Sequence, residues 1–186
     1  MALPMEQRLP GELQSFSVCR RNRLLQLHPN GLLQLRPRKN PMKSLLATSN
    51  DHVVALLRLV LGIVFFAHGA QQVHGWFHGY GFHAMMHFYE GMGIPAVFAA
   101  LAIFSMFLGG IGLIIGFLAR VAAAGIAVTM LVAVCRVHLP VGFFMNWYGT
   151  QKGEGYEFHL LAIAVAILIM VKGAGAFSID RLLAKA

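Results

Sequence analysis

Residues 53–73 read VVALLRLVLGIVFFAHGAQQV, an apolar run whose only Lys, Arg, Asp or Glu is Arg58. About 20 residues of helix, at about 1.5 Å per residue, cross a hydrocarbon core about 30 Å thick. A backbone inside lipid must pair its N–H and C=O groups within the segment, which favours a helix over a strand. The run therefore predicts a transmembrane helix.

Three more apolar runs follow, at residues 95–118, 121–139 and 157–173. The last is short, and it has Glu157 and Lys172 at its rims, where both can reach water. The whole chain is 58% hydrophobic and 12% charged, whereas soluble domains are about 45–50% apolar and about 25% charged. We predict an all-α protein, a polytopic membrane four-helix bundle in up-down-up-down order. A soluble bundle of buried helices is the alternative that this composition disfavours.

Residues 1–41 differ from the rest of the chain, because they hold most of its net charge of +8 and no long apolar run. We expect a basic, disordered tail here and the membrane domain over residues 42–186. A basic arm on anionic lipid and a translation start at Met42 are alternatives. Cys19 and Cys135 are too few for a disulfide framework. No nucleic-acid partner is expected, because the charge is concentrated in the tail.

Basic residues near the ends of the runs predict the orientation, since cytoplasmic loops are enriched in Lys and Arg. The tail, the link at Arg120 and the C-terminal segment are basic, whereas residues 74–94 contain no Lys or Arg and residues 140–156 contain only Lys152. We therefore expect both termini on the cytoplasmic side. The two long loops, which are rich in aromatic residues, are expected on the outer side.

Small residues in the second run predict where helices pack. Ser105, Gly109, Gly112 and Gly116 recur at intervals of three and four, so they share one helix face. In lipid the hydrophobic effect does not drive helices together. Helices instead associate by close packing of their backbones at faces made of small residues. We expect this face to pack inside the bundle, and homodimerisation through it is the alternative.

Polar side chains collect near the expected outer ends of three runs. A polar side chain in lipid costs free energy, so its presence there indicates a function. We expect Arg136 to pair with Glu157. The group has three interpretations: it fixes helix register, it forms an outer-leaflet pocket for a small molecule such as a quinone, or it holds haem or a metal ion between facing histidines. Its members are His68, Gln71, Gln72, Arg136, His138, Glu157 and His159.

Two further features support narrower hypotheses. His83, His87 and Glu90 stand at i, i+4 and i+7, which on a helix suits a divalent metal, although an interfacial helix without metal is the plainer interpretation. Arg58 lies about five residues into the first run, and we expect it to snorkel to the headgroups rather than face the bundle interior.

Several short motifs follow one another in order along residues 53–183. They are LRLVLG (57–62), HGAQQ (68–72), GWF (75–77), GIP (93–95), the glycine pair 109–110 with Gly116 and Arg120, GFFMNW (142–147), GEGYEFHL (153–160) and GAGAFSID (173–180). With these motifs the chain resembles the DoxX family of integral membrane proteins.

The resemblance implies a four-helix bundle of the bacterial cytoplasmic (inner) membrane. The family name is similar to that of a subunit of an archaeal terminal quinol oxidase. A related branch is tied to thiosulfate:quinone oxidoreduction, and some members are linked to membrane complexes that handle oxidative and thiol stress. Many members have Lys where Gln72 stands and Glu where Met106 stands, so this chain lacks two charges that could serve a redox site.

Three functions follow as hypotheses. The first is an accessory subunit of a membrane redox or oxidative-stress system linked to quinones, acting with a membrane or peripheral protein partner. The sequence has no complete haem, flavin or dithiol signature, which favours an accessory role over an autonomous enzyme. The second is a non-catalytic assembly or interaction factor. The third, a small oligomeric transporter, is disfavoured by four spans without a chain of acidic groups.

Overall fold

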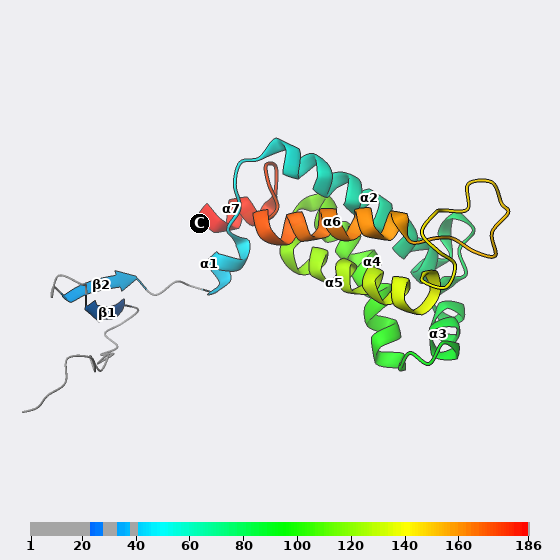
Figure 1. Cartoon of the computed structure of the whole chain (residues 1–186). Coiled ribbons are helices and arrows are strands. Elements are labelled where there is room, and N and C mark those ends of the chain that lie inside the picture. The colour runs from blue at the N-terminus through cyan, green and yellow to red at the C-terminus, as the bar shows by residue number, and fades with distance from the viewer. Residues whose placement is uncertain (1–22, 28–32, 38–40, 186) are drawn as a thin grey trace, which may run out of the picture. The chain divides into compact units, whose positions relative to one another are not determined.

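The computed structural model describes residues 23–27, 33–37 and 41–185 (Figure 1). The chain divides into two compact units, Met1–Pro41 and Met42–Ala186.

The first unit contains a pair of antiparallel strands, β1 (Arg23–Leu27) and β2 (Leu33–Pro37), with Leu25 opposite Leu35. Both strands contain Leu-Gln-Leu, which has the period of two that suits a strand. The sequence predicts a disordered tail over residues 1–41, and the structure differs in these two segments. The rest of that prediction lies outside the described residues.

The helices and strands that the structure describes in the second unit are all helices, as the sequence predicts. Its long helices are α2 (His52–His74), α4 (Ala96–Ile115), α5 (Ala119–Ala133) and α6 (Glu157–Lys172). A π-helical turn, η2 (Val134–His138), continues α5.

Three of these segments, residues 52–74, 96–115 and 119–138, are long and apolar enough to cross a membrane, the only such helices in the described part of the chain. This confirms that the first three apolar runs form helices and makes them candidate membrane spans. The fourth run forms α6, which has 16 residues and is therefore about 24 Å long.

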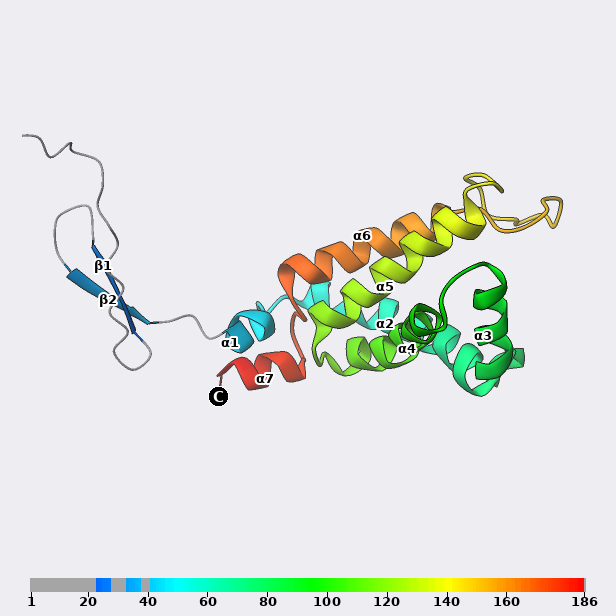
Figure 2. The ribbon, with the colours of Figure 1, turned by 90° about the horizontal axis from the view of Figure 1, so that it is seen from below.

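Four short elements lie at the two ends of the bundle. α1 (Pro41–Leu46) and α7 (Ile179–Lys185) lie at one end, here called the α7 end. At the opposite end, here called the α3 end, lie η1 (Trp76–His78), α3 (Gly81–Gly91) and the loop before α6 (Figures 1 and 2).

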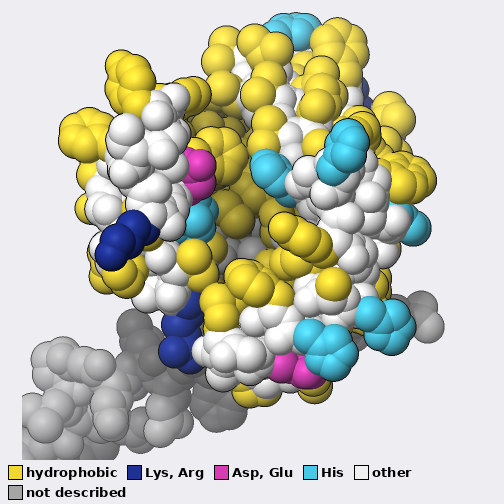
Figure 3. All heavy atoms as spheres, turned by 90° about the vertical axis from the view of Figure 1, so that its right-hand side faces the viewer, with side chains coloured by type: hydrophobic (Ala, Val, Ile, Leu, Met, Phe, Trp, Pro, Cys, Tyr) yellow, Lys and Arg dark blue, Asp and Glu magenta, His cyan; other side chains and the backbone are white. Residues whose placement is uncertain are grey.

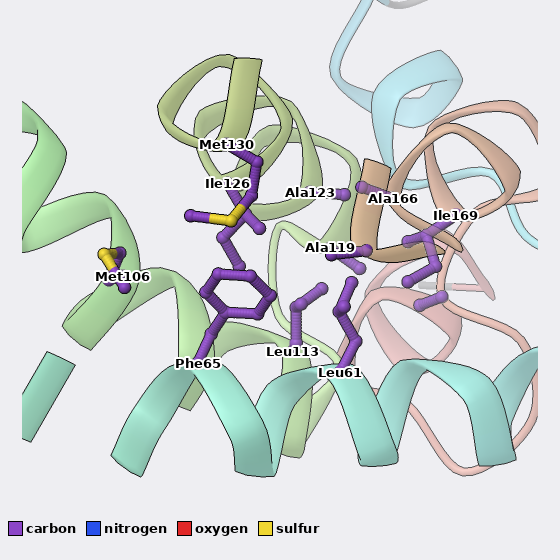
Figure 4. Close-up of a cluster of buried hydrophobic side chains, with 12 residues drawn as sticks. Leu61, Phe65, Met106, Leu113, Ala119, Ala123, Ile126, Met130, Ala166 and Ile169 are labelled. Atoms are coloured by element: carbon purple, nitrogen blue, oxygen red, sulfur yellow. The ribbon is translucent and has the colours of Figure 1, made fainter. Parts of the chain in front are cut away.

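The four long helices form a closed ring of neighbours, because α2 contacts α4, α4 contacts α5, α5 contacts α6, and α6 contacts α2. Leu61 and Phe65 point from α2 into the middle of this ring, toward Leu113 of α4 and Ile126 of α5 (Figure 4). Large apolar side chains also cover the outside of the helices; Leu161, for example, is 69% exposed. Such a surface suits lipid as the surrounding solvent.

Glycines set the close contact between α2 and α4. A Cβ atom on Gly69 would lie 2.4 Å from the backbone of Phe107, and one on Gly110 would lie 2.4 Å from the backbone of Phe66. No side chain fits at such distances, so these two glycines let the helix backbones touch. Neither was singled out from the sequence for this contact.

The glycine face expected from the sequence lies elsewhere on α4. Gly109 lies against Ile126 of α5, and a Cβ on Gly112 would lie 3.6 Å from the Cβ of Ala122. Gly116 instead ends α4 with φ 69° and lies beside Ser178. In this chain the face packs inside the bundle, against α5.

Candidate functional site

Three histidines at the α3 end lie near one another and are here called the histidine cluster: His68, His138 and His159. The rings of His138 and His159 have centroids 4.0 Å apart. His68, on α2, lies within electrostatic range of His159. The structure therefore brings together side chains from three helical segments, α2, η2 and α6.

His159 is the buried member of the cluster. It lies in the first turn of α6 and is 7% exposed. Its Nδ1 has no hydrogen-bond partner among residues 41–185. A buried polar atom left without a partner costs about 1–3 kcal/mol, so this nitrogen marks a place that a ligand or a water molecule can complete.

His138 lies at the end of η2, where Leu139 N–H donates to the carbonyl of Val134. A π-helical turn inserts an extra residue into the helix and often occurs at functional sites. The Nδ1 atom of His138 lies 2.8 Å from the backbone oxygen of Glu154. The loop before α6 thus fixes the orientation of this ring.

His68 is held by its neighbour on the same helix face. Its Nδ1 lies 3.2 Å from Oε1 of Gln71, and Gln71 Nε2 donates to the carbonyl of Phe77 at 3.2 Å. His68 and Gln71 are three residues apart and lie on the same face of α2, where they form a direct hydrogen bond.

Glu157 does not pair with Arg136 as expected. Its Oε1 accepts hydrogen bonds from the backbone N–H of Met145 at 3.2 Å and from Trp147 Nε1 at 3.1 Å. Arg136 is exposed, and the described residues contain no ion pair between the two. The prediction was wrong because the loop before α6 folds back and supplies both donors to the carboxylate.

Gln72 points away from the histidine cluster. Its Nε2 lies 3.3 Å from Sδ of Met106, and its Oε1 accepts a hydrogen bond from Tyr89 at 3.3 Å. Burial raises the pKa of the Tyr89 hydroxyl above its ordinary value, and the contact with Gln72 offsets part of that shift. Gln72 therefore links α2 to α3 and α4 rather than joining the histidines.

The surface at the α3 end is hollowed (Figure 3). The floor of the hollow is apolar, and histidine side chains border it on two sides, with an acidic side chain beside one of them. A separate small cavity of about 210 Å³ lies between α2, η1 and α3. Its lining consists of Gln71, Gln72, His78, Gly79, Tyr80 and Met85.

The proposed metal ligands on α3 do not form a site. The segment is helical, as that hypothesis required, and His83, His87 and Glu90 are all exposed. Within the described part of the chain, no group of three or more His, Cys, Asp or Glu side chains could hold a metal ion.

Arg58 faces the bundle interior, so the prediction that it snorkels was wrong. It is 3% exposed, and its Nε donates to the carbonyl of Ala174 at 2.8 Å. The end of α4 and the loop before α7 present free carbonyl groups, which replace water around the guanidinium. The other carbonyls that accept from Arg58 belong to Leu113, Ile114, Ala176 and Phe177.

Asp180, which is 2% exposed, completes this buried arrangement at the α7 end. Its carboxylate oxygens accept from the backbone N–H groups of Leu118 at 2.7 Å and Ala119 at 2.9 Å, and so cap the start of α5. Sequence reasoning missed this role, because the cap lies about sixty residues from the helix that it serves. The only available signal was an Asp within an otherwise apolar, glycine-rich motif.

Comparison with known proteins gives one match. The DoxX family model matches residues 53–139, which extend from α2 to the end of η2. No curated protein and no solved structure matches the chain.

Proposed function

This chain is a DoxX family membrane protein, and on that premise we propose that it is an accessory subunit of a membrane redox system that binds a quinone at the histidine cluster. The observation that carries the proposal is the unpartnered Nδ1 of buried His159, which lies beside His138 at the hollowed end of the bundle. A quinone needs both an apolar surface for its ring and polar partners for its oxygens.

The hollow at the α3 end supports this proposal by its chemistry. Its apolar floor suits a ring, and histidine side chains border it (Figure 3). The outer surfaces of the helices are apolar, so an isoprenoid tail could remain in lipid while the ring reaches the site. The chain then supplies binding, and a partner subunit supplies electron transfer.

We propose that the α3 end faces outward in the inner membrane of a bacterium, with both termini in the cytoplasm. In this arrangement α2, α4, α5 and α6 cross the membrane as an up-down-up-down bundle. Basic residues support this orientation, since the α7 end carries most of those in the described part of the membrane domain. Besides buried Arg58, they are Lys43, Arg120, Lys172, Arg181 and Lys185 at the α7 end, against Arg136 and Lys152 at the α3 end.

Quinone binding tests the proposed function directly. The protein in lipid nanodiscs is titrated with decylubiquinone, and binding is measured by calorimetry for the wild type and for His159→Leu. We expect His159→Leu to weaken binding about tenfold, because one polar partner of the ring oxygens is lost. His83→Leu, the same change at an exposed position on α3, should leave binding unchanged.

Absence of binding to the wild type, in both oxidised and reduced forms of the ligand, would contradict the quinone function. Equal binding by wild type and His159→Leu would contradict the assignment of the site.

A second candidate function, assembly or interaction factor, is favoured by the loop before α6. Trp147 is 79% exposed and Tyr148 is 91% exposed, and aromatic side chains are enriched at protein interfaces. Co-purification from native membranes distinguishes the two functions. A partner retained by the wild type and lost on Trp147→Ala with Tyr148→Ala, in a protein that binds no quinone, would favour this alternative.

A further inference from the structure

Arg120, at the start of α5, links that helix to α6 and to the segment after α1. Its Nη1 donates to the carbonyl of Met170 in the last turn of α6, and its Nη2 donates to the carbonyl of Ala47 at 3.0 Å. A guanidinium has five N–H groups, so three of them have no acceptor among residues 41–185. The Nε of Arg120 is buried, but the side chain as a whole is only half-buried. Its terminal nitrogens can therefore still donate to an acceptor that approaches from the surface.

Two lysines lie close to the same place along the backbone. Lys172 is the last residue of α6, two residues after Met170, and it is exposed. Lys43 lies on α1, four residues before Ala47, and it is exposed as well. The segment after α1 meets the end of α6 here, because a Cβ on Gly173 would lie 2.7 Å from the Ala47 carbonyl oxygen. The fold thus brings one guanidinium and two flexible lysines to one corner of the α7 end, here called the basic corner: Lys43, Arg120 and Lys172.

The carboxylates of the α7 end do not balance this charge. In the described part of the chain that end has six Lys and Arg residues, Arg58 included, against two acidic residues, Asp51 and Asp180. Asp51 accepts from two backbone N–H groups in the first turn of α2. Asp180 accepts from the backbone at the start of α5 and is buried near Arg58. The basic corner therefore has a surplus of positive charge that attracts an anion.

Exposed apolar side chains adjoin the basic corner on α5 and α6. Val121 directly follows Arg120, and Val171 directly precedes Lys172; both are exposed. Ile167, one turn earlier on α6, is exposed too. Because α5 and α6 pack against each other, the cations lie where the apolar surface of the two helices ends. An anion bound there has apolar surface directly beside it.

We propose that the basic corner binds the headgroup of an anionic phospholipid, whose acyl chains lie against the exposed apolar side chains of α5 and α6. The phosphate oxygens accept from the free terminal N–H groups of Arg120, because the planar fork of a guanidinium matches a phosphate. Lys43 and Lys172 add positive charge, which strengthens the attraction to anionic lipid. A soluble phosphate ester would use the cations but not the apolar surface, so the arrangement favours a lipid. This inference is independent of quinone binding at the α3 end.

Native mass spectrometry of the protein in detergent tests the proposal by counting the lipids that stay bound. The wild type is mixed with equal amounts of phosphatidylglycerol, which is anionic, and phosphatidylcholine of the same acyl chains, which is zwitterionic. We expect the first phosphatidylglycerol to bind about tenfold more tightly than phosphatidylcholine. Equal affinity for the two lipids would overturn the proposal. Displacement of the bound phosphatidylglycerol by soluble glycerol phosphate would also overturn it, since the site would then recognise phosphate without acyl chains.

Two lysine substitutions distinguish a local site from a general effect of charge. Lys172→Gln should weaken the binding of phosphatidylglycerol about fivefold and leave that of phosphatidylcholine unchanged. Lys152→Gln is the matched control, because it makes the same change at an exposed lysine of the α3 end; it should bind both lipids as the wild type does. Equal losses in the two variants would show that only net charge matters and would overturn the site.

Arg120→Lys tests the geometry of the guanidinium, because it keeps the charge and removes the fork. It should weaken the binding of phosphatidylglycerol severalfold, since an ammonium group cannot bind a phosphate in the same bidentate way. Thermal unfolding checks that the variant is folded, and Lys172→Gln tests the site independently if it is not. Wild-type affinity in folded Arg120→Lys would contradict the assignment of the phosphate to Arg120.

Discussion

Gln72 and Met106 meet between α2 and α4, with Gln72 Nε2 3.3 Å from the Met106 sulfur. These are the two positions at which the family resemblance implies Lys and Glu. Their contact places both departures from that pattern within one pair of neighbouring side chains, both of them uncharged in this chain.

The contact predicts strong coupling between charges placed at these positions. Met106 is 5% exposed, so Met106→Glu alone should lower the free energy of unfolding by about 3 kcal/mol, because it buries an unpaired carboxylate. Adding Gln72→Lys should restore about 1–3 kcal/mol. Thermal unfolding in nanodiscs compares the wild type, each single variant and the double variant. Additive effects of the two substitutions would contradict the contact.

Because α2 and α4 are in close contact, we expect Gly69 to tolerate no larger side chain. Gly69→Val should destabilise the fold by about 1–3 kcal/mol, because the added atoms would overlap the backbone of Phe107. Gly91→Val is the matched control, since a Cβ at Gly91 meets nothing within 4 Å. Thermal unfolding in detergent compares the two variants. Similar losses for both would refute the close approach of the helices.

Length and apolar composition were enough to predict the three candidate membrane helices, because lipid imposes both on any spanning segment. The direction of individual polar side chains was not predictable. Arg58 was expected at the headgroups, yet it faces carbonyls that are brought together only when the end of α4 meets the loop before α7. Glu157 was expected to pair with Arg136, but its partners come from a loop that has no periodic pattern.

The proximity of the histidines was predictable in part. The sequence placed His68, His138 and His159 at one level of the bundle, and the structure brings them together. It could not show that Gln71 and Gln72, which are adjacent in sequence, serve different neighbours. That separation depends on the turn at Phe77 and on α3, whose tertiary contacts have no local sequence signature.

We expect the packing of α3 to depend on pH through ionisation of Tyr89. Burial raises the pKa of its hydroxyl, so the folded protein retains this proton above the pH at which the unfolded chain, with an ordinary tyrosine pKa of about 10, loses it. The stabilisation from neutral Tyr89 is present below that pH and is lost as pH rises through the folded-state pKa. Absorbance titration should show one late-ionising tyrosine.

Tyr89→Phe should remove this late component and leave the early ones. If the component lost in Tyr89→Phe titrated together with the exposed tyrosines, the packing of α3 over Gln72 would be contradicted.

Substitution of Arg58 should cause the largest loss of stability among changes at the α7 end. Arg58→Leu should lower the free energy of unfolding by about 3–5 kcal/mol, because it leaves carbonyl groups unpaired and removes the positive charge near buried Asp180. Arg58→Lys should recover only part of this, since an ammonium group cannot span carbonyls from both α4 and the loop before α7. Arg136→Leu is the same change at an exposed arginine, and its free energy of unfolding should stay within about 0.5 kcal/mol of the wild-type value. Hydrogen exchange at the Ala119 amide gives a local measurement, because loosening of Asp180 should expose that amide first. If Arg58→Leu left the protection of this amide unchanged, the guanidinium would not hold this end of the bundle together.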